Sequence, residues 1–237
     1  SGFNALETLG GELVIASNAS LTSIDGESAA FPSLTTVGGI NLEDNRLLTS
    51  AEGFGALTTI TGTLTINDNP ALTRIVGNAA LTTVGGVSIR YNPQLAEISG
   101  FDSVVSFTGE FVCYRNNNDY RRNLTIGGFG ALTSIGGSLQ IAWNEGVDLV
   151  TAFASLVTIG GNLSLDCNDG DTLFANFANL ETIGGNLSLS RWESFPSTIF
   201  PALTTANAAE VGTNETEFCA RVTTTEYCRA NYGCPLS

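Results

Sequence analysis

The sequence contains no lysine and no histidine, and its cationic side chains are nine arginines against 23 acidic residues. The resulting formal charge of −14 repels the phosphates of nucleic acids and the surfaces of anionic membranes, so we expect neither as a partner. Without histidine, and with only five cysteines, a tetrahedral zinc site is not expected either. We interpret the acidity as a solubilising surface, with weak Ca²⁺ binding as the alternative.

Long apolar runs are also missing. No stretch approaches about 18 apolar residues, so the sequence predicts no transmembrane helix and no insertion into a membrane. The chain begins without the basic and apolar segments of a signal peptide, and we expect a mature form or an expressed fragment. Apolar residues nevertheless make up 43% of the sequence and charged residues only 14%, which is typical of a chain with a sizeable core.

The sequence repeats itself. Aligned on a phenylalanine, the copies typically read Phe-x-x-Leu-x-x-Ile or Val, followed by one or two glycines. The copies begin at Phe3, Phe31, Phe54, Asn78 (in the phenylalanine position), Phe101, Phe129, Phe153 and Phe177, and the pattern fades at Phe200. Most steps are 23 or 24 residues long and two are 28, and a period of this length predicts a stack of similar rungs.

Each copy continues with an apolar triplet, and in the first seven copies an asparagine follows the triplet. The first and third residues of the triplet are apolar and the middle one is usually polar, which predicts a short strand with one face inward. The triplets are residues 13–15, 40–42, 64–66, 87–89, 111–113, 139–141, 163–165 and 187–189. The asparagines are Asn18, Asn45, Asn69, Asn92, Asn116, Asn144 and Asn168. We expect their amides to satisfy backbone groups at a tight corner and to bond one another as a ladder.

The pattern Leu-x-x-Ile-Gly-Gly-Asn-Leu-Ser-Leu is cleanest at residues 156–165 and 180–189. It resembles the leucine-rich-repeat family in its receptor L-domain variant, which occurs in growth-factor receptor ectodomains and in fungal cell-wall surface proteins. The resemblance covers roughly residues 3–205. It implies a right-handed β-helix-like solenoid and an extracellular recognition or structural role, but no catalytic residues and no particular ligand.

We therefore predict an all-β fold: a right-handed parallel β-helix, or leucine-rich-repeat-like solenoid, of about eight rungs of 23–28 residues. One rung cannot bury its own apolar faces, so residues 1–205 are expected to form one cooperative L-domain-like unit. The exposed end of such a stack needs a cover. We therefore interpret residues 206–237, where the period fails, as a C-terminal cap that bears a disulfide.

The cysteines support that interpretation. Cys219, Cys228 and Cys234 gather in the predicted cap, which favours at least one disulfide and an oxidising compartment. Cys167 is a further disulfide candidate and could pair with the cap. Cys113 takes an inward position of a triplet and is expected to be a small buried apolar residue. Because five is an odd number, one thiol stays free or bonds another chain.

Five sequons allow N-glycosylation if the source is eukaryotic. They lie at Asn18, Asn123, Asn162, Asn186 and Asn214.

The irregular fifth copy provides the candidate ligand site. Its insertion at residues 114–123 carries three of the nine arginines, and further arginines and aromatic residues occupy the equivalent corner of neighbouring copies. Since successive rungs are about 4.8 Å apart, these side chains are expected to line one edge of the sheet and to bind a sugar or a protein. The predicted ligand-binding residues are Arg90, Tyr91, Tyr114, Arg115, Tyr120, Arg121, Arg122, Trp143, Arg191 and Trp192.

Two other activities are alternatives for this sequence: ice binding and polysaccharide cleavage. A row of threonines (Thr8, Thr36, Thr59, Thr83, Thr158, Thr182 and Thr205, with Ser106 and Ser134 in the same position) is compatible with ice binding, but it lies within Leu-Thr-Thr-Ile segments rather than Thr-x-Thr strands. A polysaccharide-cleaving enzyme needs two carboxylates about 5–9.5 Å apart. The only acidic cluster near a sheet edge, at Asp166, Asp169 and Asp171, reads more simply as an exposed turn or a loose Ca²⁺ site.

The sequence thus predicts a non-enzymatic protein of the extracellular space or cell surface. We expect it to bind a protein or glycan ligand for recognition, adhesion or cell-wall scaffolding, without cofactors and as a repeat domain of a larger protein. The alternative is a self-assembling structural subunit of a filament or surface layer.

Overall fold

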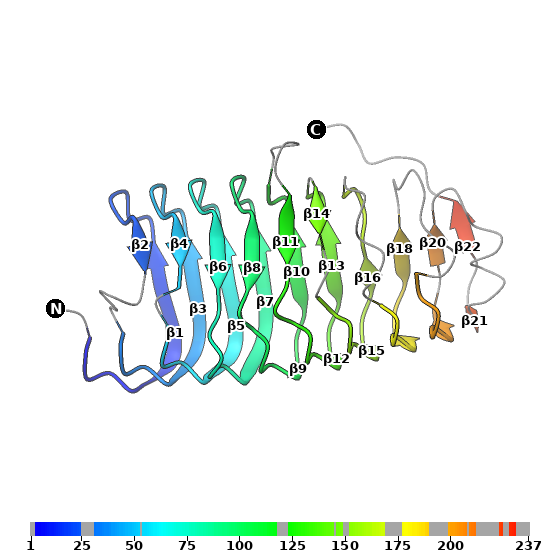
Figure 1. Cartoon of the computed structure of the whole chain (residues 1–237), viewed down its shortest axis with the longest axis horizontal. Helices are drawn as coiled ribbons and strands as arrows, with labels where there is room; N and C mark the ends of the chain where they lie inside the picture. Colours follow the sequence, from blue (N-terminus) through cyan, green and yellow to red (C-terminus); the bar gives the residue numbers. More distant parts are fainter. Residues whose placement is uncertain are drawn as a thin grey trace.

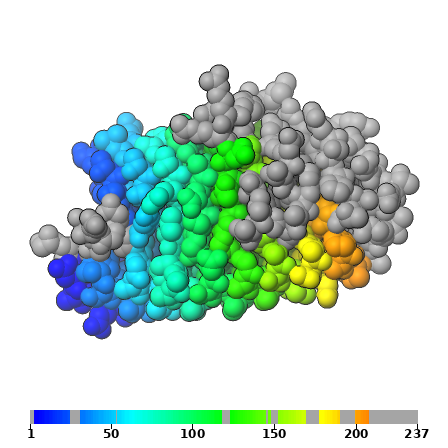
Figure 2. All heavy atoms as spheres, viewed as in Figure 1, coloured from blue at the N-terminus to red at the C-terminus, as the bar shows by residue number. Residues whose placement is uncertain are grey.

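The computed structural model describes residues 3–24, 31–52, 54–117, 123–144, 146–148, 152–168, 177–189, 199–207, 209–211, 223–224 and 228–230, with side chains up to residue 207 except that of residue 148. These residues form an all-β solenoid of stacked parallel strands, so the predicted fold class is confirmed. The rungs follow one another along the long axis in the order of the sequence (Figure 1), and the same succession appears in the space-filling view (Figure 2).

A sheet of 16 strands forms the larger wall of the solenoid. Its first four rungs each contribute one long strand: β1 (Thr8–Ala16), β3 (Thr36–Glu43), β5 (Thr59–Asn67) and β7 (Thr83–Arg90). The later rungs each contribute two short ones. Those before the glycines are β9 (Ser106–Phe107), β12 (Ser134–Ile135), β15 (Thr158–Ile159), β17 (Thr182–Ile183), β19 (Thr205–Ala206) and β21 (Thr223–Thr224). Those at the triplets are β10 (Phe111–Tyr114), β13 (Leu139–Ala142), β16 (Leu163–Ser164), β18 (Leu187–Leu189), β20 (Ala209–Val211) and β22 (Cys228–Ala230).

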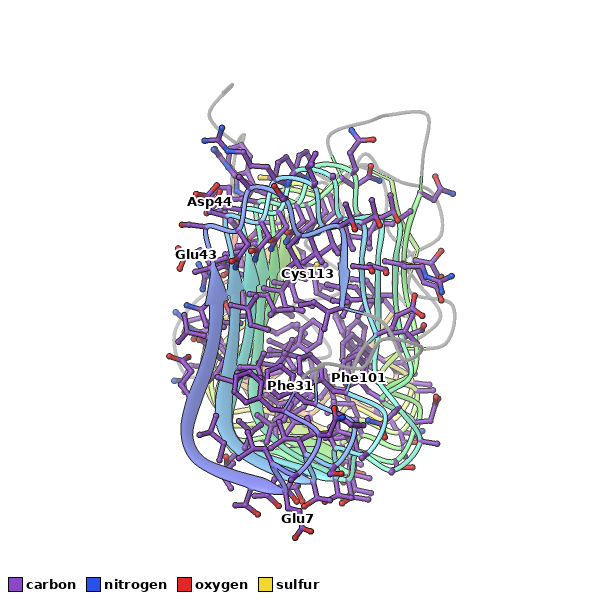
Figure 3. The ribbon with its side chains drawn as sticks, turned by 90° about the vertical axis from the view of Figure 1, so that its left-hand side faces the viewer. Glu7, Phe31, Glu43, Asp44, Phe101 and Cys113 are labelled. Carbon is purple, nitrogen blue, oxygen red and sulfur yellow. The ribbon has the colours of Figure 1, made fainter. Side chains whose placement is uncertain are left out.

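A second parallel sheet of six short strands lies across the core from the triplets (Figure 3). Its strands are β2 (Ser23–Ile24), β4 (Ser50–Ala51), β6 (Arg74–Val76), β8 (Glu97–Ser99), β11 (Leu124–Ile126) and β14 (Val147–Asp148). Each of these strands places at least one apolar residue inward, for example Ile75 and Ile98, which are paired in register and buried. Apolar side chains from both sheets therefore share one core.

The glycine segment between the two strand positions brings consecutive rungs into close backbone contact. A Cβ atom built on Gly38 would lie 2.5 Å from the carbonyl oxygen of Gly10, and one built on Gly85 would lie 2.5 Å from that of Thr61. No real side chain tolerates such distances to a rigid backbone atom. Close approach, rather than a left-handed backbone, is therefore what requires glycine at these two positions.

Phenylalanine rings stack on one another inside the solenoid. The ring centroids of Phe31 and Phe54 are 6.3 Å apart, and those of Phe101 and Phe129 are 5.0 Å apart with nearly parallel planes. Figure 3 shows Phe31 and Phe101 inside the cross-section, while Glu7, Glu43 and Asp44 point outward. Stacking buries each ring almost completely from Phe101 onward and adds aromatic contacts to the gain from burial.

The predicted asparagine ladder is present. At Asn92 the side-chain amide donates to the backbone oxygen of Ile66 (3.0 Å), and its Oδ1 accepts the backbone N–H of Asn69 (3.1 Å). The backbone N–H of Asn92 donates in turn to Oδ1 of Asn116 at 3.1 Å. The backbone bond to the next asparagine recurs at every step from Asn18 to Asn168. From Asn45 to Asn168 the ladder therefore joins consecutive rungs through side chains that are buried from water.

The larger sheet extends beyond the point where the repeat fades in the sequence. Strand β20 pairs in parallel with β18, and β22 pairs with β20, with Leu189, Val211 and Ala230 in register. Strand β21 likewise continues the row of β19. The described backbone of residues 206–237 thus adds strands to the same sheet, and the predicted disulfide-bearing cap stays a prediction.

Removing one buried asparagine of the ladder should destabilise the whole solenoid. We expect Asn92→Ala to lower the free energy of unfolding by about 3 kcal/mol. The substitution leaves the buried N–H of Asn69 without its acceptor, at roughly 1–3 kcal/mol, and removes the bond to the carbonyl of Ile66, at roughly 0.5–1.5 kcal/mol. Asn18→Ala, at the exposed end of the ladder, should cost less than about 1 kcal/mol. Urea denaturation measures both, and equal losses for the two variants would contradict the buried role of the ladder.

Candidate functional site

The residue before each ladder asparagine adopts a left-handed backbone. These corner residues are Ser17, Asp44, Asp68, Tyr91, Arg115, Trp143 and Cys167, with φ between 50° and 60°. Their own N–H groups continue the sheet; that of Arg115, for example, donates to the backbone oxygen of Ala142 (3.2 Å). The backbone of each corner is held on one side by this bond and on the other side by the ladder. The side chain of the corner residue therefore points outward, as Figure 3 shows for Asp44.

Three consecutive corners carry large side chains, Tyr91, Arg115 and Trp143, which Tyr114 joins into one series of contacts. The guanidinium carbon of Arg115 lies 4.9 Å from the ring centroid of Trp143 and 5.7 Å from that of Tyr114. The rings of Tyr114 and Tyr91 meet edge to face at 5.9 Å. Tyr91 is 44% exposed and the other three side chains are partly exposed. We call Tyr91, Tyr114, Arg115 and Trp143 the aromatic–arginine cluster.

The electrostatics of the cluster set it apart from the rest of this acidic surface. Arg90, beside Tyr91, donates to the Ser88 hydroxyl (3.0 Å) and lies 3.9 Å from the carboxylate of Glu110. Among the described residues, no carboxylate comes within ion-pair distance of Arg115. Its guanidinium therefore lies over two rings, and no carboxylate of the described chain forms an ion pair with it.

The structure brings together five of the ten predicted ligand-binding residues: Arg90, Tyr91, Tyr114, Arg115 and Trp143. The other five, Tyr120, Arg121, Arg122, Arg191 and Trp192, lie outside the described residues. Sequence reasoning missed Glu110 as the partner of Arg90. The available signal was its position immediately before the triplet at residues 111–113, next to Gly86 of the preceding rung.

Cys113 is a buried free thiol, as predicted for its inward position. Burial raises its pKa from 9.0 to about 12, and the hydrogen bond that it accepts from the amide of Asn116 (3.3 Å) lowers the pKa only in part. A thiol in this state is a poor nucleophile. Cys167 is disulfide-bonded, while the side chains of Cys219, Cys228 and Cys234 lie outside the described residues, so pairing with the predicted cap stays a prediction.

The sequons differ in their surroundings. Asn18, Asn123, Asn162 and Asn186 are all exposed. The side-chain amide of Asn18 donates to the Ala16 carbonyl (3.1 Å) and to the next ladder asparagine, while Oδ1 of Asn162 accepts the backbone N–H of Asn186 (2.9 Å). Asn214 lies outside the described residues. Glycosylation at each stays a prediction.

No three side chains of the metal-binding kinds come together in the part of the chain that the structure describes. Within the predicted acidic turn, Asp166 accepts hydrogen bonds from the hydroxyls of Ser164 (2.6 Å) and Ser188 (2.7 Å), and Asp169 and Asp171 are not among the described residues. The described residues contain no helix with the length and apolar character needed to cross a bilayer.

The threonine row stacks in register, with Thr36 paired to both Thr8 and Thr59. In the adjacent row, Thr35 and Thr58 donate their hydroxyl hydrogens to the carbonyl oxygen of the preceding rung at 3.0 Å. These hydroxyls therefore connect rungs, and the exposed Val105 interrupts their row. These bonds neither support nor oppose the prediction that the threonines bind ice.

A scan against models of protein families finds no match to this chain, and searches of curated proteins and of solved structures find none either. The resemblance to L-domain leucine-rich repeats therefore stays a prediction drawn from the repeat itself.

The buried state of Cys113 predicts its reactivity. In the native protein at pH 8, an excess of thiol reagent should titrate the same number of thiols in the wild type as in Cys113→Ala, because the Cys113 thiol is inaccessible and protonated. In denaturant the reagent should titrate one thiol more in the wild type than in Cys113→Ala. A native-state difference of one thiol between the two proteins would show that Cys113 is exposed.

Proposed function

We propose that this chain is a non-enzymatic extracellular recognition module of the L-domain leucine-rich-repeat type, and that it binds an acidic glycan at the aromatic–arginine cluster. The observation that carries the proposal is the run of Tyr91, Arg115 and Trp143 at three consecutive left-handed corners. The disulfide at Cys167 agrees with an oxidising, extracellular setting.

The backbone at these corners argues for a function of the side chains. A left-handed conformation costs a residue with a Cβ atom on the order of 1–2 kcal/mol, and glycine, asparagine and aspartate adopt it most easily. The second and third rungs follow this preference with Asp44 and Asp68, whereas the next three carry Tyr91, Arg115 and Trp143. Large side chains persist at strained positions when they have a role that a smaller residue cannot fill.

The chemistry of the cluster favours an acidic sugar. Flat, partly exposed rings such as Tyr91 and Trp143 offer apolar faces on which a pyranose ring can stack. Arg115 has donors in a planar fork that matches a carboxylate, and the flanking rings fix its orientation in advance. A ligand with an apolar face and a carboxylate would use both features, and the surrounding negative charge would disfavour acidic molecules that lack the apolar face.

One further observation favours the alternative of self-association. Within the described residues, strand β1 pairs only with β3, so its other edge is open. On this rung Phe3 is 65% exposed and Val14 is 55% exposed. An open strand edge with apolar neighbours is a template for pairing, so a second copy of the chain is the candidate occupant.

The glycan proposal is tested on an array of sugars followed by titration of the strongest binder. We expect Trp143→Ala and Arg115→Gly to weaken binding more than about 10-fold, as for central residues of an interface. Arg115→Gly should leave the free energy of unfolding within about 1 kcal/mol of the wild type, because glycine relieves the strained backbone. Arg46→Ala, which removes an exposed arginine paired with Asp44 on an earlier rung, should leave binding unchanged.

Two results would refute the glycan proposal: an acidic sugar that binds Trp143→Ala and Arg115→Gly as well as the wild type, or an array on which no sugar binds. In the second case, capture of a defined protein ligand that depends on Trp143 would assign the cluster to protein recognition instead.

Self-association is measured separately by light scattering of the pure protein over a range of concentrations. If the open edge of β1 mediates it, Val14→Lys should abolish the growth in mass, because a lysine on an edge strand opposes pairing. Val105→Lys is the matched control, since Val105 is equally exposed and lies away from that edge. A monomer at all concentrations, or equal effects of the two substitutions, would contradict this alternative.

A further inference from the structure

The row of corner residues changes the sign of its charge along the solenoid. The corners of the second and third rungs are Asp44 and Asp68, and Glu43 lies beside the first of them. The fourth rung carries Arg90 beside its corner, and the fifth carries Arg115 at its corner. We call Glu43, Asp44 and Asp68 the acidic half of the row and the two arginines its cationic half. All five side chains are exposed or half-buried, so both halves are open to contact.

The acidic half has little compensation within the described chain. Its one ion pair among the described residues joins Asp44 to Arg46 at 3.7 Å, and both side chains are well exposed to solvent, where such pairs are weak. Partial burial, together with the negative charges of Glu43 and Asp44, raises the pKa of Asp68. A positive charge from outside the chain would therefore stabilise this half.

The order of the charges makes the row complementary to a second copy of itself. A two-fold axis that points outward between the third and fourth rungs would place a second solenoid antiparallel to the first. Asp68 of each copy then faces Arg90 of the other, and Asp44 faces Arg115, because such a contact is isologous. Successive rungs are about 4.8 Å apart in both copies, so the two rows stay in register.

The rings of the row lie near the centre of the same contact. Tyr91, the corner of the fourth rung, lies beside this axis and is 44% exposed. Trp143, one rung beyond Arg115, is half-buried. Tyrosine, tryptophan and arginine are enriched in protein interfaces. A second copy would thus cover exposed rings as well as pair the opposed charges.

The net charge of each copy opposes this contact only weakly. Each chain carries a formal charge of −14, but charges separated by more than about 8 Å are largely screened at physiological ionic strength. The opposed side chains of two facing rows lie much closer to one another than that. The local complementarity of the row therefore decides whether two copies attract.

We propose that two copies of this chain pair side by side and antiparallel through the corner row, so that the acidic half of each copy contacts the cationic half of the other. The pairing requires only the charges of the row and does not depend on the glycan proposal. A second copy and an acidic glycan would exclude one another at Arg115. The contact also differs from association through the open edge of β1, which lies in the first rung.

Sedimentation equilibrium of the pure chain, without sugar and at about 0.15 M salt, tests the pairing. The mass of the wild type should approach that of a dimer as the concentration increases. Asp44→Arg with Asp68→Arg should weaken the dimer more than about 10-fold, because like charges then face each other. Arg90→Glu with Arg115→Asp should do the same. An equimolar mixture of the two double variants should restore the dimer, since a mainly cationic row then faces an acidic one.

The substituted side chains suit their positions. Arginine already occupies one left-handed corner and aspartate two others, and Glu43 holds the position equivalent to that of Arg90. The matched control is Glu7→Arg with Glu181→Arg, which changes the net charge by the same amount at exposed positions. Glu7 lies at the opposite end of the cross-section from Asp44 (Figure 3), so this control should dimerise like the wild type.

Three results would overturn the proposal: a wild type that stays monomeric up to its solubility limit, a dimer that persists in both double variants, or folded double variants that do not pair when mixed. If a double variant does not fold, salt takes its place. The wild-type dimer should weaken more than about 10-fold between about 0.15 M and 1 M salt, where the screening length falls to about 3 Å. A dimer that is indifferent to salt would contradict pairing through the row.

Discussion

The hydrogen bond from one ladder asparagine to the next is the interaction on which the rest of this solenoid depends. A parallel stack of short rungs leaves backbone groups unpaired wherever the chain turns between strands, and such groups are costly when buried. Each ladder amide meets this need twice, as Asn92 does by donating to the carbonyl of Ile66 and accepting the N–H of Asn69. The corner is thereby fixed in each rung from Asn18 to Asn168, and the triplet before it is fixed in register.

The proposed binding surface follows from the same constraint. Because each ladder asparagine is preceded by a left-handed residue, the fold generates a row of outward side chains spaced by one rung. On most rungs that position holds a small residue, and on three rungs it holds Tyr91, Arg115 and Trp143. Fold and recognition are thus carried by adjacent residues: the asparagine faces inward and bonds the stack, while its neighbour faces outward and can contact a ligand.

Much of the fold could be predicted because the period of the sequence is the period of the structure. The ladder, the inward position of Cys113 and the grouping of Tyr114 with Trp143 all follow from aligning the copies. The left-handed corners could not be predicted, because no glycine marks them and Arg115 and Trp143 disfavour that conformation. The strands beyond Thr205 were not predicted because no glycine pair precedes β20, although Ala209–Val211 keeps the apolar, polar, apolar order of the earlier triplets. Nor does the sequence reveal that the Asn78 amide turns back onto the neighbouring backbone.

Native-state hydrogen exchange of the ladder amides tests the central claim most directly. The backbone N–H groups of Asn69, Asn92 and Asn116 lie at corners, where amides ordinarily exchange quickly, yet each donates to a buried side-chain oxygen of the next rung. If the ladder holds the stack together, these amides exchange only when the protein unfolds globally, with the same free energy of opening as the amides of β5 and β7. Exchange at rates typical of exposed turns, while the strand amides stay protected, would contradict the account.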